Sequence, residues 1–339
     1  MKKLPEEKQS FQELFSLLNG ALKSRLLLLG LELGVFDRLG EASSAEAAAR
    51  QLELHPGNTA KFLDALAVIG LLEKKNGLYR NRPSNQAFLV RDSPTHVGDL
   101  FLLYWEMCLS GLERAAELIR RGPGATPTDH DLAAPETWAK WSRAGAQWAF
   151  GFMGGTIAGL VSRLPGFSGF QKMLDLGGGH GVFTLYIVQA HPTMRGVVLD
   201  QAAVLETAEA LGRRFEFGSR IETRPGDYLQ DHIGDDYDLI FASSTLNTAK
   251  DRIDELFDQA YRALKPGGYF LCLQDGLTDE RTKPETMLGH LIHSLETEKD
   301  LIFDQGFLAE AMLRAGFRQV RSRTMETPMG PLDLDVGRK

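Results

Sequence analysis

The segment "KMLDLGGGHGVF", residues 172 to 183, constrains the fold of this chain more than any other. An apolar strand ends at Asp175, and an amphipathic helix is expected after the glycine loop. The loop glycines are Gly177, Gly178, Gly179 and Gly181. Glycines after a strand let the backbone turn sharply and approach a nucleotide-like ligand, because no side chain intervenes. The same pattern also serves tight strand-to-helix packing, so alone it is moderate evidence for a ligand.

Further acidic residues follow the next two predicted strands. From "GFSGFQKMLDL" onward strands and helices alternate, which predicts a doubly wound, Rossmann-like α/β domain. The next strand ends at Asp200, nineteen residues past Gly181, and Asp227 and Tyr228 follow a third strand. Each acid alone is explained as a turn or cap residue. Three at successive strand ends fit one nucleotide-like ligand better, with Asp200 accepting ribose hydroxyls.

The acid just before the glycines distinguishes between nucleotides. A carboxylate at position 175 would repel the pyrophosphate of a dinucleotide. A ligand that carries an ammonium and a sulfonium would instead be attracted. The sequence therefore predicts S-adenosylmethionine as the cofactor.

Composition limits the partners and the location of the protein. A net charge of -7 without a concentrated basic patch argues against binding to nucleic acid or to an anionic membrane. The amino terminus, "MKKLPEEKQS", lacks the apolar run of a signal peptide. The longest apolar stretch, "RLLLLGLELGVF", is interrupted by Glu32 and is expected to be far too short to span a bilayer.

The two cysteines also bear on the cellular location of the protein. Cys108 and Cys272 lie far apart in the sequence and match no metal-binding spacing. A reducing, cytoplasmic compartment fits this usage best, and both thiols are expected in the core.

The amino-terminal part has the pattern of a winged helix. Apolar residues at helical spacing between positions 11 and 40 predict helices broken at Gly30 and Gly34. Ser44 is a good cap for a short helix, a second helix follows, and Asn76-Gly77 marks a hairpin. The predicted recognition helix carries only Lys61 beside Asp64, too little positive charge to anchor phosphates. A packing or dimerisation role is therefore favoured over DNA binding.

Residues 100 to 165 are expected to be helical and are rich in aromatic side chains. Packing in the core is the usual role of such residues, but as a group they could also wall an apolar pocket. The side chains predicted to line a substrate pocket are Trp148, Phe152, Met153 and Met287. We expect a dimerisation domain at 1–100, a helical linker that contributes to the pocket at 101–165, and a cofactor-binding domain at 166–339.

Motifs along nearly the whole chain resemble one family. "LDLGGGHG", "VVLD", "PGDY" and "LKPGG", in this order and spacing, resemble the class I S-adenosylmethionine-dependent methyltransferases. "ALKSRLLLLGLELGVFDRL" and "FLDALAVIGLLEKKNGLYRNRP" narrow the resemblance to the dimeric small-molecule O-methyltransferases, over residues 11 to 325.

The resemblance implies a cofactor site and an oligomeric state. Asp175 and the Gly177 to Gly181 loop would hold the methionine part of S-adenosylmethionine, and Asp200 would bind the ribose. Asp227 and Tyr228 would contact the adenine, where Ser243 takes the place of the usual basic residue. A homodimer built through the winged-helix domain is also implied.

The catalytic positions depart from the family's pattern. The relatives carry a His-Asp pair after the fourth strand, where this chain has Asn247 and Thr248. The acid expected after the fifth strand is Gln274, and the second expected acid has no clear counterpart, although Glu296, Glu298 and Asp300 are nearby. An amide cannot accept a proton as a general base does.

Two histidines could replace the missing base. His290 and His293 lie three residues apart, on neighbouring faces of a predicted helix. Either could remove a proton from the acceptor, or both could be ordinary surface or capping residues. The spacing also suits a metal, but no third ligand is evident, so no metal is expected.

Three functions remain open at this point. The first is methyl transfer to a small aromatic or apolar molecule, with Asn247 orienting the acceptor. The second uses the bound sulfonium for non-methylating chemistry such as decarboxylation, hydroxylation or cyclisation, because the usual base is missing. The third is a dimeric binding or regulatory protein without catalysis.

Overall fold

The computed structural model describes residues 10–124, 134–297 and 299–339 and divides the chain after Leu102 into two units. The second unit contains most of the aromatic helical segment together with the α/β domain. A separate linker at 101–165 stays a prediction.

The amino-terminal unit is a helical domain with a small three-stranded sheet. Its elements are α1 (Ser10–Glu32), α2 (Val35–Arg38), β1 (Ser43–Ser44), α3 (Ala45–Gln51), α4 (Pro56–Val68), β2 (Leu72–Lys75), β3 (Leu78–Asn81), α5 (Pro83–Leu89) and the start of α6 (Gly98–Tyr104). The hydroxyl of Ser44 accepts a hydrogen bond from the backbone N–H of Ala47, which confirms the predicted cap. The hairpin is confirmed too, with positive φ at Asn76 and Gly77.

Helix α1 corrects one expectation and confirms another. It runs unbroken through Gly30, because the missing side chain makes room for Phe36: a Cβ at Gly30 would lie 2.7 Å from that ring. The predicted break at Gly34 is confirmed, since this residue has φ 67° and precedes α2. The helix has 23 residues. By length and composition, the longer segment Phe11–Glu32, which ends within the predicted apolar stretch, is long and apolar enough to cross a membrane; a core helix or a signal sequence would pass the same test.

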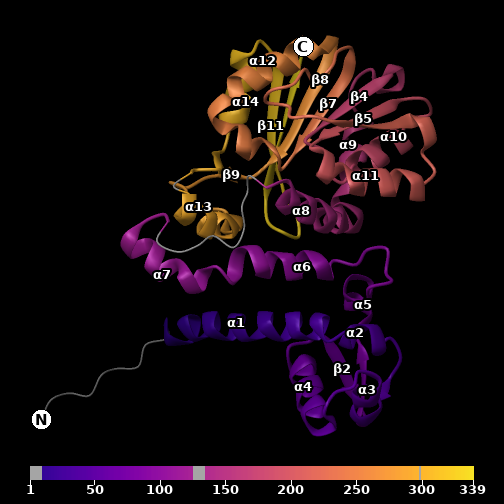
Figure 1. Ribbon diagram of the computed structural model, residues 1–339, viewed down its shortest axis with the longest axis vertical. Coiled ribbons are helices and arrows are strands. Elements are labelled where there is room, and N and C mark those ends of the chain that lie inside the picture. Colours follow the sequence, from indigo (N-terminus) through magenta and orange to yellow (C-terminus); the bar gives the residue numbers. More distant parts are fainter. Residues whose placement is uncertain (1–9, 125–133, 298) are drawn as a thin grey trace, which may run out of the picture. The chain divides into compact units, whose positions relative to one another are not determined.

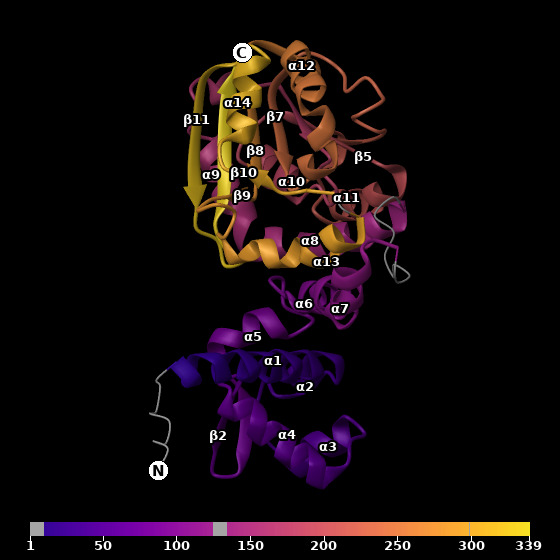
Figure 2. The same ribbon diagram turned by 90° about the vertical axis from the view of Figure 1, so that its left-hand side faces the viewer.

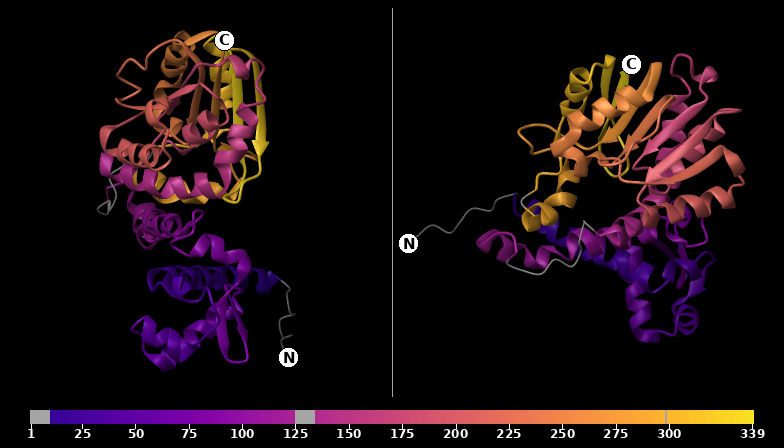
Figure 3. Two further views of the ribbon diagram at one scale, coloured as in Figure 1. Left: turned by 90° about the vertical axis from the view of Figure 1, so that its right-hand side faces the viewer. Right: turned by 45° about the horizontal axis from the view of Figure 1, so that its top comes forward.

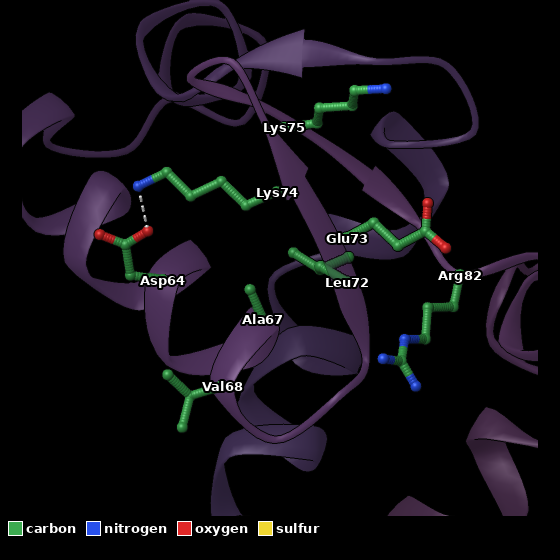
Figure 4. A pocket seen from close by; sticks show the side chains of 8 residues that line it. All are labelled: Asp64, Ala67, Val68, Leu72, Glu73, Lys74, Lys75 and Arg82. Carbon is green, nitrogen blue, oxygen red and sulfur yellow. Dashed lines mark hydrogen bonds and ion pairs between the residues drawn. The ribbon is translucent and has the colours of Figure 1, made fainter.

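A groove of about 790 Å³ lies between α4 and the hairpin (Figure 4). Its lining residues are Asp64, Ala67, Val68, Leu72, Glu73, Lys74, Lys75 and Arg82. Figure 4 shows the ammonium of Lys74 directed at Asp64, 2.5 Å away, so this cation of the groove already has a counter-ion.

The second unit contains a seven-stranded sheet of order β11-β12-β8-β7-β4-β5-β6. The strands are β4 (Lys172–Leu176), β5 (Arg195–Asp200), β6 (Ile221–Pro225), β7 (Tyr237–Ser243), β8 (Leu264–Gln274), β11 (Arg318–Met325) and β12 (Leu332–Arg338). The strands from β8 to β6 are parallel, and β12 and β11 add an antiparallel pair at one edge (Figure 3). The predicted doubly wound α/β fold is confirmed.

Helices cover both faces of this sheet (Figure 1). One face packs on α12 (Ile253–Ala263) and α14 (Phe307–Arg314), and Cys272 lies buried in that core. The other face packs on η2 (Ala149–Met153), α9 (Gly154–Val161) and α10 (Val182–Gln189), and α11 (Ala202–Arg214) covers β5 on this side. Cys108 is buried as well, so both cysteines are core residues as expected.

Further helices of this unit lie at the carboxyl ends of the parallel strands. Figures 1 and 2 show α8 (Pro135–Trp148) and α13 (Leu291–Thr297) across the same end of the sheet. The other elements are η1 (Trp105–Leu109), α7 (Leu112–Arg121), η3 (Phe167–Gly169), η4 (Gly218–Arg220), η5 (Leu246–Arg252), β9 (Gly276–Leu277), η6 (Glu285–His290) and β10 (Phe303–Asp304). In doubly wound sheets, ligands bind at this end of the strands.

Candidate active site

Asp175 is the second-last residue of β4 and lies buried under the glycine loop. Its Oδ2 accepts a hydrogen bond from the hydroxyl of Thr184 at 2.7 Å, and the residue is 1% exposed. Burial, followed by the nearby charge of Asp200, raises the pKa of Asp175 to about 7. A Cβ at Gly178 would lie 2.5 Å from Cγ of Asp175, so only glycine lets the loop pass this close.

Asp200 ends β5 and faces the same loop. Its Oδ2 accepts a hydrogen bond from the backbone N–H of Gly179 at 2.9 Å. Burial raises the pKa of this carboxyl also. The structure thus brings together two carboxyls that the sequence placed at successive strand ends. Their pKa values are raised although each already accepts a hydrogen bond, so a nearby cation would favour their ionised forms.

The loop fits closely against the segment that follows β7. A Cβ at Gly177 would lie 2.1 Å from Oγ1 of Thr245, and Gly177 has φ 62°. The hydroxyl of Tyr228 donates a hydrogen bond to the carbonyl of Thr245 at 2.8 Å. Tyr228 is therefore held at the carboxyl end of the parallel strands, near the glycine loop.

Asp227 and Ser243 differ in how far their polar atoms are used. The carboxylate of Asp227 accepts hydrogen bonds from the N–H of Leu229 and from Nε2 of Gln230, as a turn residue does. Ser243, the last residue of β7, has a buried hydroxyl with no protein partner. A buried hydroxyl without a protein partner, at the carboxyl end of β7, can form a hydrogen bond with a ligand or a water molecule.

Asn247 lies in the first turn of η5, beyond the end of β7. Its Nδ2 donates to the carbonyl of Leu301 at 2.6 Å, and its Oδ1 accepts from Nε2 of Gln274 at 2.6 Å. These two amides, at the positions where the resemblance predicts titratable groups, are thus bonded to each other. Oε1 of Gln274 remains buried without a partner.

His290 and His293 have different surroundings. His290 is partly exposed, and its Nε2 lies 3.2 Å from Oδ2 of Asp275, the residue directly after β8. His293 lies one turn further along, with Nε2 3.5 Å from the hydroxyl of Thr297. Burial, and then the neighbouring His290 and Lys299, lower the pKa of His293.

The four predicted pocket residues do not form one group. Met153 is fully buried in the core, and Trp148 packs edge-to-face on Phe183 with its indole N–H buried and unpartnered. Phe152 is exposed. Met287 lines a separate cavity of about 290 Å³ between η6, α13 and residues 299–302. Their contacts with an acceptor stay predictions.

Sequence reasoning missed several residues of this region. Asp275 was overlooked although it follows Gln274, because its spacing from His290 fits no periodic pattern. Leu301 contributes only a backbone carbonyl, which no side-chain pattern reveals. His180, within the glycine loop itself, accepts a hydrogen bond from the N–H of Val182, and burial lowers its pKa to about 4.

The order of the sheet, the glycine loop after its central strand β4 and the acids at the ends of β4 and β5 define a class I methyltransferase. Two family models place it more closely. The chain matches the "O-methyltransferase dimerisation domain" at residues 15–91 and the "O-methyltransferase domain" at residues 155–304. The protein belongs to this family of S-adenosylmethionine-dependent O-methyltransferases with a dimerisation domain, as its motifs predicted.

Curated relatives match over most of their length. The N,N-dimethyltransferase OxyT of Streptomyces rimosus is 29% identical over 280 residues, which are 80% of each chain. The tetracenomycin polyketide synthesis 8-O-methyl transferase TcmO of Streptomyces glaucescens is 26% identical over 324 residues, 93% of each chain.

Solved structures share the fold. Human N-acetylserotonin methyltransferase, crystallised with S-adenosylmethionine, is 22% identical, with a TM-score of 0.80 over 99% of each chain. An O-methyltransferase family protein from Burkholderia thailandensis is 21% identical, with a TM-score of 0.80 over 98% of this chain and 99% of that one.

The residues present fit S-adenosylmethionine, the cofactor of the family. Burial raises the pKa of both Asp175 and Asp200, and a ligand with a cationic group and hydroxyl donors, such as the ammonium and ribose of this cofactor, would favour their ionised forms. Gly178 keeps the loop free of a Cβ that would collide with Asp175. The unpartnered hydroxyl of Ser243 supplies a further polar group at the same edge.

Proposed function

We propose that the protein methylates a hydroxyl group on a small, apolar and aromatic molecule. The observation that carries this proposal is the pair of carboxyls beside the glycine loop: Asp175 is buried, and Asp200, partly buried, accepts a hydrogen bond from the N–H of Gly179. Relatives named for tetracenomycin 8-O-methylation and for acetylserotonin O-methylation support an oxygen of a small molecule as the acceptor.

The cofactor residues have distinct roles in this proposal. Asp175 and the glycines at 177, 179 and 181 bind the methionine part, and Asp200 accepts hydrogen bonds from the ribose. Asp227, Tyr228 and Ser243 lie beside the adenine. Bound S-adenosylmethionine supplies an electrophilic methyl group on a sulfonium. The chain positions the acceptor oxygen in line with that methyl group and excludes water from it.

The acceptor side is built from the helices at the same end of the sheet. We place Trp148, Phe152 and Met287 on different sides of the acceptor, and Met153 belongs to the core cluster against which Trp148 packs. This gives the 101–165 segment a part in the pocket. Asn247, which is held by its hydrogen bonds to Leu301 and Gln274, orients the acceptor. His290 or His293 acts as the base.

The amino-terminal unit forms a homodimer in this proposal. Apolar residues of α1 are exposed in the single chain: Phe11, Leu14, Phe15, Leu17, Leu18 and Leu22. A winged-helix arrangement of α3, α4 and the β2–β3 hairpin would then serve packing rather than DNA or membrane binding. A cytoplasmic location fits the two buried, unpaired cysteines.

Incubation with methyl-labelled S-adenosylmethionine tests the function. The acceptors are N-acetylserotonin, 3-hydroxy-2-naphthoic acid and an aliphatic amine, and both methylated product and S-adenosylhomocysteine are measured. We expect label on the aromatic hydroxyls and equimolar S-adenosylhomocysteine.

The same assay separates the alternatives. An altered acceptor without S-adenosylhomocysteine would indicate non-methylating chemistry, which the non-basic Asn247 favours as the second candidate. Labelled amine alone would assign N-methylation, as in the name of OxyT. Calorimetry that detects no cofactor binding would contradict both enzymatic functions.

A further inference from the structure

The position of the family's usual base is closed by a directional chain of hydrogen bonds. The carbonyl of Leu301 can only accept, so Asn247 must present its Nδ2–H₂ to it, at 2.6 Å. Oδ1 of Asn247 then faces Gln274, which must present its own Nε2–H₂, also at 2.6 Å. Both amide orientations are therefore determined, and neither group can hold the proton of an acceptor.

A carboxylate-histidine pair stands directly beside this chain. Asp275 follows Gln274 at the end of β8, and its Oδ2 lies 3.2 Å from Nε2 of His290 at the end of η6. The two side chains are only 18% and 33% exposed, so the contact is partly shielded from water. An ionised carboxylate can only accept, so Nε2 carries the hydrogen and Nδ1 is left as the basic nitrogen.

The surroundings favour His290 over the other histidines. In the described ranges, only His290 and the exposed His232 lie within ion-pair distance of a carboxylate. His293 faces Thr297, and no described carboxylate contacts it. The phenol of Tyr104 adds a polar group near the pair, because a Cβ at Gly289 would lie 2.9 Å from its hydroxyl. Among the described residues, none forms a hydrogen bond with Nδ1 of His290.

The pair lies at the cofactor end of the sheet. Thr245 touches the glycine loop at Gly177, Asn247 follows two residues later, and Gln274 connects Asn247 to the strand end that carries Asp275. Figure 2 shows α13, which His290 directly precedes, across the same end of the sheet as α8. The pair is thus close to where an acceptor must meet the methyl group.

We propose that His290, held by Asp275, is the general base of this enzyme and replaces the absent pair at positions 247 and 248. The inference rests on the proposed function. The oxygen–hydrogen bond of the acceptor breaks, its proton moves to Nδ1 of His290, and the oxygen bonds to the methyl carbon. The electron pair of the broken sulfur–carbon bond stays on sulfur. Asp275 is a positioning residue that fixes the imidazole tautomer and stabilises the imidazolium.

Acceptor acidity distinguishes this role from a structural one. The probes are 2-naphthol, which must lose its proton during transfer, and 1-nitro-2-naphthol, which is largely ionised at neutral pH. We expect His290→Asn to lower kcat on 2-naphthol by about 10²- to 10⁴-fold and Asp275→Asn by at least about tenfold. Both variants should retain most of their activity on 1-nitro-2-naphthol. Equal losses on both probes would overturn the proposal.

Two further variants control this comparison. Asp235→Asn removes the carboxylate of the exposed His232 pair, 3.4 Å apart, and should change neither rate. If His293→Asn, rather than His290→Asn, shows the loss that depends on acceptor acidity, His290 is not the base.

A second readout needs no acceptor. Nitrogen-15 NMR of the intact protein with bound S-adenosylhomocysteine should show His290 with its proton on Nε2, and Asp275→Asn should redistribute that proton between the two nitrogens. A wild-type His290 without this tautomer preference would overturn the proposal. If the preference is present but no acceptor is methylated, the proposed function fails instead.

Discussion

Gln274 donates a hydrogen bond from Nε2 to Oδ1 of Asn247 at 2.6 Å, and this contact ties the end of β8 to the first turn after β7. Asn247 extends the tie to Leu301. Two neutral amides thus provide at this position a rigid connection that does not titrate.

Removing either amide should destabilise the protein through the other. Asn247→Ala leaves Nε2 of the buried Gln274 without an acceptor, which costs about 1–3 kcal/mol of unfolding free energy. The double variant Asn247→Ala/Gln274→Ala should cost less than the sum of the single changes, by at least about 0.5 kcal/mol. Urea denaturation of the four proteins measures this coupling. As a control, Glu255→Ala removes one partner of an exposed ion pair and should change the unfolding free energy by less than about 0.5 kcal/mol. If the effects of Asn247→Ala and Gln274→Ala on this free energy are additive in the double variant, the coupling is contradicted.

Cofactor affinity should depend on pH through Asp175. Burial raises its pKa to about 7, so the free protein gains stability from the neutral acid at low pH and loses it as pH rises through 7. A cationic cofactor favours the carboxylate, so below pH 7 binding should release up to one proton. As the pH rises towards 7, the affinity should therefore increase by up to about tenfold per pH unit. Calorimetry in two buffers with different ionisation enthalpies measures the number of protons that binding releases. Asp175→Asn should bind more weakly and without this release; proton uptake by the wild type would contradict the assignment.

Gly177 should tolerate no side chain. Its φ is 62° and a Cβ would lie 2.1 Å from Oγ1 of Thr245, so Gly177→Ala should displace the loop and weaken cofactor binding at least tenfold. Gly155, in helix α9, has nothing within 4 Å of its missing Cβ. Gly155→Ala should leave binding unchanged and stabilise the protein by about 0.5–1 kcal/mol. Calorimetric titration with S-adenosylhomocysteine compares the two, and equal affinities would refute the constraint.

The exposed apolar face of α1 should control assembly. Leu18 is 64% exposed in the single chain, so Leu18→Asp should not disturb a core but should desolvate a charge in a dimer. Analytical ultracentrifugation should show the wild type as a dimer and this variant as a monomer at micromolar concentration. Val68, 86% exposed on α4, provides the control, because Val68→Asp should remain dimeric. A wild-type monomer would contradict the proposed homodimer.

Much of the architecture followed from local patterns. The glycine loop, the alternation of strands and helices, the cap at Ser44 and the turn at Asn76-Gly77 are each determined within a few residues. The break predicted at Gly30 failed because the glycine serves a contact with Phe36, and sequence alone does not reveal whether a glycine ends a helix or makes room beside it.

The sequence by itself determined the fold class, the family and the cofactor, because glycines and acids at strand ends occupy fixed places in a doubly wound sheet. Only the tertiary structure showed that Asn247 binds Gln274 and that Asp275 binds His290. These partners come from segments far apart in the sequence, around the ends of β7 and β8 and in η6, and how such segments meet depends on tertiary packing rather than on any local period.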